Sequence, residues 1–166
     1  LAVGRGGSVK IDGCDLTKNE AAKGDGGAIS IIGNRGSVIV LNSVMRQNAA
    51  INGGFVSIKG ASTIFLQESH AWQNEARING GVFALDGPSA LTWRYGAIVN
   101  NHALTNGGAG YVGGVSSLNL YATAFMRNKA QQYGGAIMAT HIKKPIPQEL
   151  TGATGPKEPE PDDEVQ

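Results

Sequence analysis

The 166-residue chain has a single cysteine, few charged residues and no long hydrophobic run, and each shortage excludes a class of protein. Cys14 alone cannot form an internal disulfide, and the chain has no zinc or iron–sulfur spacing. No apolar stretch approaches the roughly 18 residues that predict a membrane-spanning helix. Charged residues make up 16% of the chain and leave a net charge of +1, too little to indicate a nucleic-acid partner. We therefore expect no metal, no cofactor, no nucleic acid and no membrane span.

Glycine is in excess, and its spacing predicts a repeat. The 25 glycines lack the three-residue period and the high proline content of collagen. Gly-Gly pairs recur every 27 residues, at Gly26-Gly27, Gly53-Gly54, Gly80-Gly81, Gly107-Gly108 and Gly134-Gly135. Single glycines follow at Gly33, Gly60, Gly87 and Gly114, and the pairs are preceded by Asp25, Asn52, Asn79, Asn106 and Tyr133. Because Gly and Asn adopt left-handed backbone conformations readily, we interpret these positions as two corners of a repeating coil.

The residues between the corners recur in columns. Two apolar columns have the period of a strand with one buried face: Val9, Val38, Ile64, Leu91 and Leu118, then Ile11, Val40, Leu66, Trp93 and Leu120. A later column holds only asparagine: Asn19, Asn48, Asn74, Asn101 and Asn128. Stacked at a strand spacing of about 4.8 Å, the asparagines would form a ladder of amide hydrogen bonds. The pattern predicts an all-β fold, a right-handed parallel β-helix of about five 27-residue coils with three short strands each.

Two recurring motifs carry a resemblance to a known family. The segments LTKNEA, MRQNAA, AWQNEA, IVNNHA and FMRNKA are followed in turn by GGAI, GGFV, GGVF, GGAG and GGAI. This pattern resembles the FxxN and GGAI repeats of polymorphic outer-membrane proteins over residues 8 to 138, although only Phe125 supplies the Phe of the motif. The resemblance implies a right-handed β-helix displayed on a bacterial surface, often adhesive, and so an extracellular or cell-surface location.

The two ends of the chain differ from the repeats. We expect the β-helix to occupy residues 1–141 and a terminating segment residues 142–150, where Pro145 and Pro147 remove strand donors. Residues 151–166 have the composition of an acidic, proline-rich tail or linker. At the other end the first coil is predicted to present an open β edge, so we expect another protein chain or further coils to lie against it.

Carboxylates are present but do not share columns as the chemistry of polysaccharide-cleaving β-helix enzymes requires. Asp86 matches Lys59 and Gly113 in the neighbouring repeats, while Glu20 and Glu75 share a column but lie two coils apart. We therefore expect these acids to be solvated, outward-facing groups.

Histidine and cysteine give no stronger indication of chemistry. His70, His102 and His141 fall in three different columns, which disfavours a metal site or a proton relay. Cys14 belongs to a column of small residues and is predicted to be a buried, inert thiol. We predict no catalytic, cofactor-binding or metal-binding residue.

Apolar side chains at outward positions indicate an interaction surface. Along the FxxN strand the possible partner face consists of Val44, Trp72, Val99 and Met126, and along the GGAI strand Phe55, Tyr111 and Met138 are also expected outside. We expect either a partner protein or residues 140 to 150 to cover this face. Glycans or a host surface are further candidate partners of the protein. The sequence thus favours a non-catalytic β-solenoid, an adhesive or structural module at a cell surface or in a larger complex. A carbohydrate-active β-helix enzyme with a divergent site is the alternative.

Overall fold

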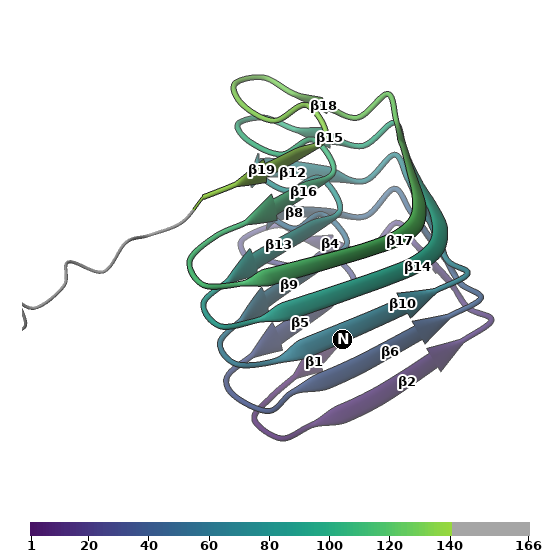
Figure 1. Ribbon diagram of the computed structural model, residues 1–166, viewed down its shortest axis with the longest axis vertical. Helices are drawn as coiled ribbons and strands as arrows, with labels where there is room; N and C mark the ends of the chain where they lie inside the picture. The colour runs from purple at the N-terminus through teal and green to yellow at the C-terminus, as the bar shows by residue number, and fades with distance from the viewer. Residues whose placement is uncertain (141–166) are drawn as a thin grey trace, which may run out of the picture.

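The described part of the chain is one stack of β-coils. The computed structural model describes residues 1–140, which form a parallel β-solenoid without any helix (Figure 1). The predicted segments 142–150 and 151–166, like His141, lie outside the described residues. Partners in register are 26 to 29 residues apart, as between Val9, Val38 and Ile64. The structure confirms the predicted all-β solenoid of about five coils.

Each coil passes through three parallel sheets, which we call B, C and A in chain order. Sheet B contains β2 (Ser8–Asp12), β3 (Asp15–Thr17), β6 (Ser37–Leu41), β7 (Val44–Arg46), β10 (Thr63–Gln67), β11 (His70–Trp72), β14 (Ala90–Val99) and β17 (Ser117–Met126). Sheet C contains β4 (Glu20–Ala21), β8 (Ala49–Asn52), β12 (Glu75–Asn79), β15 (His102–Ala103) and β18 (Lys129–Ala130). Sheet A contains β1 (Ala2–Val3), β5 (Ile29–Ile32), β9 (Val56–Lys59), β13 (Phe83–Asp86), β16 (Gly110–Val112) and β19 (Ile137–Ala139). Coil 1 therefore starts at β2 and coil 5 at β17.

The core consists of the apolar columns, and in two places an aromatic side chain packs against a glycine of a neighbouring position. The two apolar columns of sheet B face inward, with Val38, Val40, Ile64, Leu66, Leu91 and Trp93 all buried. Trp93 donates from its indole Nε1 to the carbonyl of Ser69, 3.2 Å away, beside Gly96, where any Cβ would collide with the indole. The ring of Phe83 likewise fills the space that Gly110 leaves in the next coil. At these two glycines, the absence of a side chain leaves the space that an aromatic ring occupies.

Phe55 corrects one expectation, because it is 0% exposed although alternation from the GGAI strand placed it outside. At this corner two successive amides share one acceptor: Ala28 and Ile29 both donate to the carbonyl of Phe55, and Phe55 and Val56 both donate to that of Val82. Such a bulge resets the alternation, so both consecutive residues face the core.

The coil has four corners, two more than the glycines indicated. Each ladder asparagine is preceded by a non-glycine residue with positive φ: Lys18, Gln47, Gln73, Asn100 and Arg127, with φ of 52° to 56°. A second set divides sheet B in each coil and consists of Gly13, Asn42, Glu68, Tyr95 and Ala122. These bends divide the sheet B part of each coil into two segments, which are continuous only in β14 and β17.

Candidate binding surfaces

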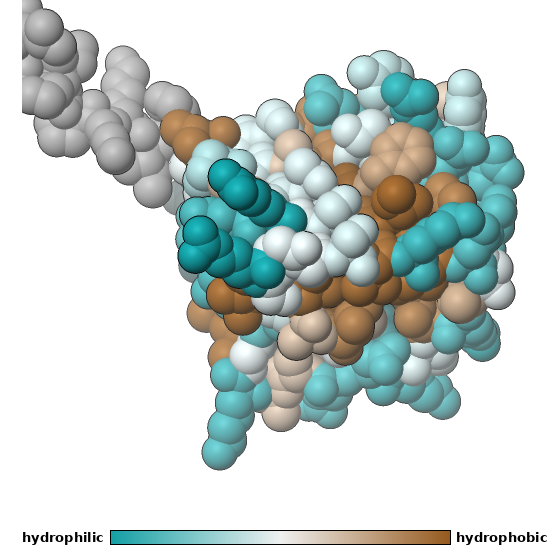
Figure 2. Space-filling model, turned by 90° about the horizontal axis from the view of Figure 1, so that it is seen from below, coloured by the Kyte–Doolittle hydropathy of each residue, from teal (hydrophilic) through white to brown (hydrophobic). Residues whose placement is uncertain are grey.

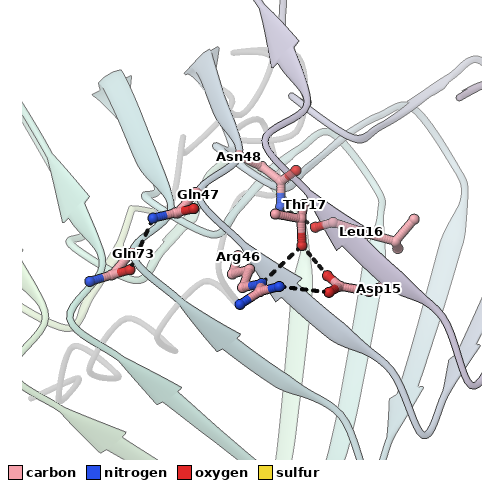
Figure 3. Close-up of polar contacts among 7 residues, drawn as sticks. All are labelled: Asp15, Leu16, Thr17, Arg46, Gln47, Asn48 and Gln73. Atoms are coloured by element: carbon pink, nitrogen blue, oxygen red, sulfur yellow. Dashed lines mark hydrogen bonds and ion pairs between the residues drawn. The ribbon is translucent and has the colours of Figure 1, made fainter.

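The five column asparagines form a continuous ladder through the corner between sheets B and C. Each Nδ2 donates to the Oδ1 of the asparagine in the following coil, from Asn19 to Asn128, over 2.9 to 3.0 Å. The backbone amide of each donor residue reaches the same Oδ1. Each Nδ2 beyond Asn19 also donates to a carbonyl of the preceding coil, for example Asn48 to Leu16 over 2.8 Å (Figure 3). The ladder satisfies its own buried polar groups and has a direction, because every bond between two asparagine side chains is donated towards the next coil.

A second ladder occupies the corner before the Gly-Gly pairs and runs in the opposite direction. Asn52 donates to Asp25 and Asn106 to Asn79, while the backbone amide of Asn79 reaches Asn52. From the sequence, this column is interpreted only as turn residues, although the repeated Asn52, Asn79 and Asn106 are the signal for a ladder. The ladder ends at Tyr133, which leaves Asn106 Oδ1 buried without a partner in the described residues.

Asp25, the first residue of the second ladder, forms an ion pair with Lys59. Lys59 Nζ lies 2.7 Å from Asp25 Oδ2. Burial acts to raise the pKa of Asp25, but hydrogen bonds from Lys59 and Asn52 outweigh it and leave that pKa below its ordinary value. The hydrogen bond to Asp25 raises the pKa of Lys59. The pair is therefore fully charged at neutral pH, and it spans the outer face of sheet A.

The predicted partner face divides into two neighbouring columns. Trp72, Val99 and Met126 stack directly on one another on the outside of sheet B, and Met126 is 49% exposed. Val44 lies in the adjacent column, where its partner in register is His70. We call Trp72, Val99 and Met126 the apolar strip.

The strip changes to polar side chains towards coil 1. Arg46 pairs with Trp72 in register and donates to Asp15 over 2.9 Å and to Thr17 over 3.1 Å, while Thr17 also contacts Asp15 (Figure 3). The charged cluster occupies the positions that correspond to the strip in the first two coils. The apolar strip is thereby confined to coils 3 to 5.

Most of the surface carboxylates near coil 1 are engaged by neighbouring polar groups. Asp12 contacts Lys10 and Asn42, and Glu20 lies 3.6 Å from Arg77. In the part of the chain that the structure describes, no three His, Cys, Asp or Glu side chains are grouped as metal ligands. The register keeps Ala49 between Glu20 and Glu75, as the column alignment predicted.

Cys14 is exposed, which contradicts the prediction of a buried thiol. Its column counterparts Ser43 and Ser69 are buried, at 1% and 0% exposure, because a coil lies on each side of them. Cys14 belongs to coil 1, so within the described residues its side facing away from coil 2 is not covered.

These features define the class of protein, a parallel β-solenoid with two polar ladders and an apolar strip on one outer face. Comparisons with family models, with curated proteins and with solved structures found no match for this chain. Within residues 1–140, no helix is long and apolar enough to cross a membrane.

Proposed function

We propose that the protein is a non-catalytic β-solenoid, an adhesive or structural module at a cell surface or in a larger complex, of the polymorphic outer-membrane repeat type. The apolar strip is the observation that carries the proposal. Trp72, Val99 and Met126 form a row on a rigid sheet, and contiguous apolar surface of this kind is typical of interaction sites.

The outer face beside the strip extends this surface. Arg94 lies between the rings of Phe65 and Tyr121, with its guanidinium carbon 5.7 Å and 4.9 Å from their centroids. Aromatic and arginine side chains are the residues that contribute most to protein–protein binding. Because the stacked coils hold them in a fixed order, a partner would meet a preorganised face.

Trp72→Glu is expected to weaken adhesion at least about tenfold, since it places a charge in the apolar strip and removes its largest side chain. Beads coated with the protein would be counted on a panel of bacterial and animal cells under flow. The half-buried position of Trp72 predicts a loss of less than about 1.5 kcal/mol in the free energy of unfolding.

Ile32→Glu is the matched control, because Ile32 is 60% exposed and lies on the outer face of sheet A, away from the strip. Retention equal to that of the unchanged protein is expected for this variant. If Trp72→Glu beads adhere as well as the control, the strip is not the adhesive face. A variant that fails to fold would place Trp72 in the core.

The coil 1 end is a second contact surface. In Figure 2, hydrophobic residues gather at the middle of this end, where Val9, Ile11 and Leu16 are only partly buried. Asn19 donates through its Nδ2 to Asn48, so its own Oδ1 is the acceptor that a preceding coil would meet. We propose that coil 5 of a second copy stacks there head to tail, because Asn128 would supply the donor. Head-to-head stacking would instead oppose two acceptors.

Thr123→Cys tests this arrangement, because Thr123 occupies the Cys14 column in coil 5. Head-to-tail stacking places the two positions about 4.8 Å apart, within the roughly 4.4–6.8 Å that a disulfide spans. Mild oxidation of the concentrated variant is expected to give a ladder of multimers on a non-reducing gel. Ser69→Cys, buried in the same column, is expected to give none. Monomers alone, or Cys14 dimers of the unchanged protein, would refute the arrangement.

A further inference from the structure

The outer face of sheet A carries a small groove that is distinct from the apolar strip. Its volume is about 280 Å³, just below the roughly 300–1,000 Å³ that is typical of ligand sites. Ser57 and Ala84 form its floor, and although alternation sends both outward they are only 2% and 6% exposed. Side chains on both sides therefore rise well above this floor.

Each side of the groove is formed by a different element. The second ladder forms one wall with Asn52 and Asn79, and Asp86 lies on the opposite wall. Lys59 closes the end towards coil 1, where its bond to Asp25 carries its side chain across the sheet. Tyr111 closes the other end. The ladder and the ion pair thus fix the shape of the groove before any ligand enters.

Three polar groups that line the groove have no partner among the described residues. Asn79 accepts through Oδ1 from Asn106, but its Nδ2 donates to no described group, unlike the Nδ2 of Asn52 and Asn106. The hydroxyl of Ser57 and the carboxylate of Asp86 likewise make no hydrogen bond or ion pair within residues 1–140. A donor, a hydroxyl and an acceptor therefore face one small space.

An apolar platform completes the site. A Cβ on Gly113 would lie 2.9 Å from the Tyr111 ring, so the missing side chain lets this ring lie down against the sheet. The Tyr111 hydroxyl is 3.2 Å from the Thr140 hydroxyl, which secures the ring at its far end. Together with the methyl group of Ala84, the ring offers a flat apolar surface beside the polar walls.

We propose that this groove binds one sugar ring of a neutral glycan. Neighbouring hydroxyls of a sugar both donate and accept, so they can serve Asp86, Ser57 and Asn79 together, while the C–H face of the ring packs on Tyr111. A free carboxylate at Asp86 disfavours an anionic ligand, and the Lys59 ammonium cannot offset this charge because Asp25 already neutralises it. The inference does not depend on the apolar strip, which lies on a different sheet.

The test begins with an array of neutral and anionic oligosaccharides probed with the full chain, and the strongest neutral ligand is then titrated by calorimetry. Asp86→Asn retains the shape but removes the charge, and Tyr111→Ala removes the platform. Each is expected to weaken binding at least about tenfold, the effect of losing one charged hydrogen bond or one stacked ring.

Two control variants separate binding from folding. Tyr111→Phe keeps the ring and is expected to bind within about threefold of the unchanged protein, because only the hydroxyl that contacts Thr140 is lost. Trp72→Glu is expected to bind the glycan normally even where it abolishes adhesion. The proposal is overturned if no neutral glycan binds, if anionic glycans are preferred, or if Asp86→Asn and Tyr111→Ala, with unchanged thermal unfolding, bind as tightly as the original chain.

Discussion

Asn74→Ala is expected to lower the free energy of unfolding by about 3–5 kcal/mol. Asn74 lies at the middle of the first ladder and is 1% exposed. Its Oδ1 accepts from both the backbone amide and the side chain of Asn48, and its Nδ2 donates to Met45 and Asn101. Alanine leaves the backbone amide of Asn48, one hydrogen of its Nδ2 and the carbonyl of Met45 without these partners in a buried site, which is more costly than losing the bonds themselves.

The matched control is Asn19→Ala at the end of the same ladder. Asn19 is exposed, and its side chain makes one bond, to Asn48, which water can replace. Its loss is expected to lower the free energy of unfolding by less than about 1 kcal/mol. Urea unfolding of both variants, followed by circular dichroism, measures the difference. Equal losses at the two positions would show that burial of the ladder contributes little.

The ladder column could be found in the sequence because its chemistry is periodic and local. An asparagine recurs at the same place in every repeat, and stacking of parallel strands brings such residues into contact whatever the rest of the coil does. The apolar columns of sheet B were predictable for the same reason. The predicted register of Leu66 with Trp93, for example, is the observed one.

The corners formed by non-glycine residues could not be found in this way. Gln47, Glu68 and Tyr95 adopt positive φ, a conformation that their residue types do not favour. The stacked coils impose it, because the ladder asparagine after Gln47 and the buried serine after Glu68 must both face the interior. The conformational preference of these residue types does not predict such a bend, because the bend results from tertiary packing.

The groove was also beyond sequence reasoning, for a different physical reason. The column alignment placed Asp86 beside Lys59 and Gly113, and the register confirms the pairing with Lys59. It could not show that Lys59 reaches across the sheet to Asp25, or that the Tyr111 ring lies over Gly113. Both depend on side-chain direction, which a column of residue types does not contain.

Packing between Phe83 and Gly110 provides the second large effect. Gly110→Ala is expected to lower the free energy of unfolding by about 2–4 kcal/mol, because the new Cβ would lie only 2.0 Å from the Phe83 ring. Gly110 is not among the residues with positive φ, so alanine adopts its backbone conformation without strain and the loss measures the collision.

The double-mutant cycle with Phe83→Val isolates this contact. Phe83→Val alone leaves a cavity in a fully buried position and is expected to lower the free energy of unfolding by about 2–3 kcal/mol. In that background Gly110→Ala is expected to be neutral or stabilising, since its methyl group enters the space that the ring has left. The two changes should therefore be coupled by at least about 2 kcal/mol in urea unfolding. Additive losses would mean that the coil relaxes around each residue separately, and that the ring and the glycine do not specify one another.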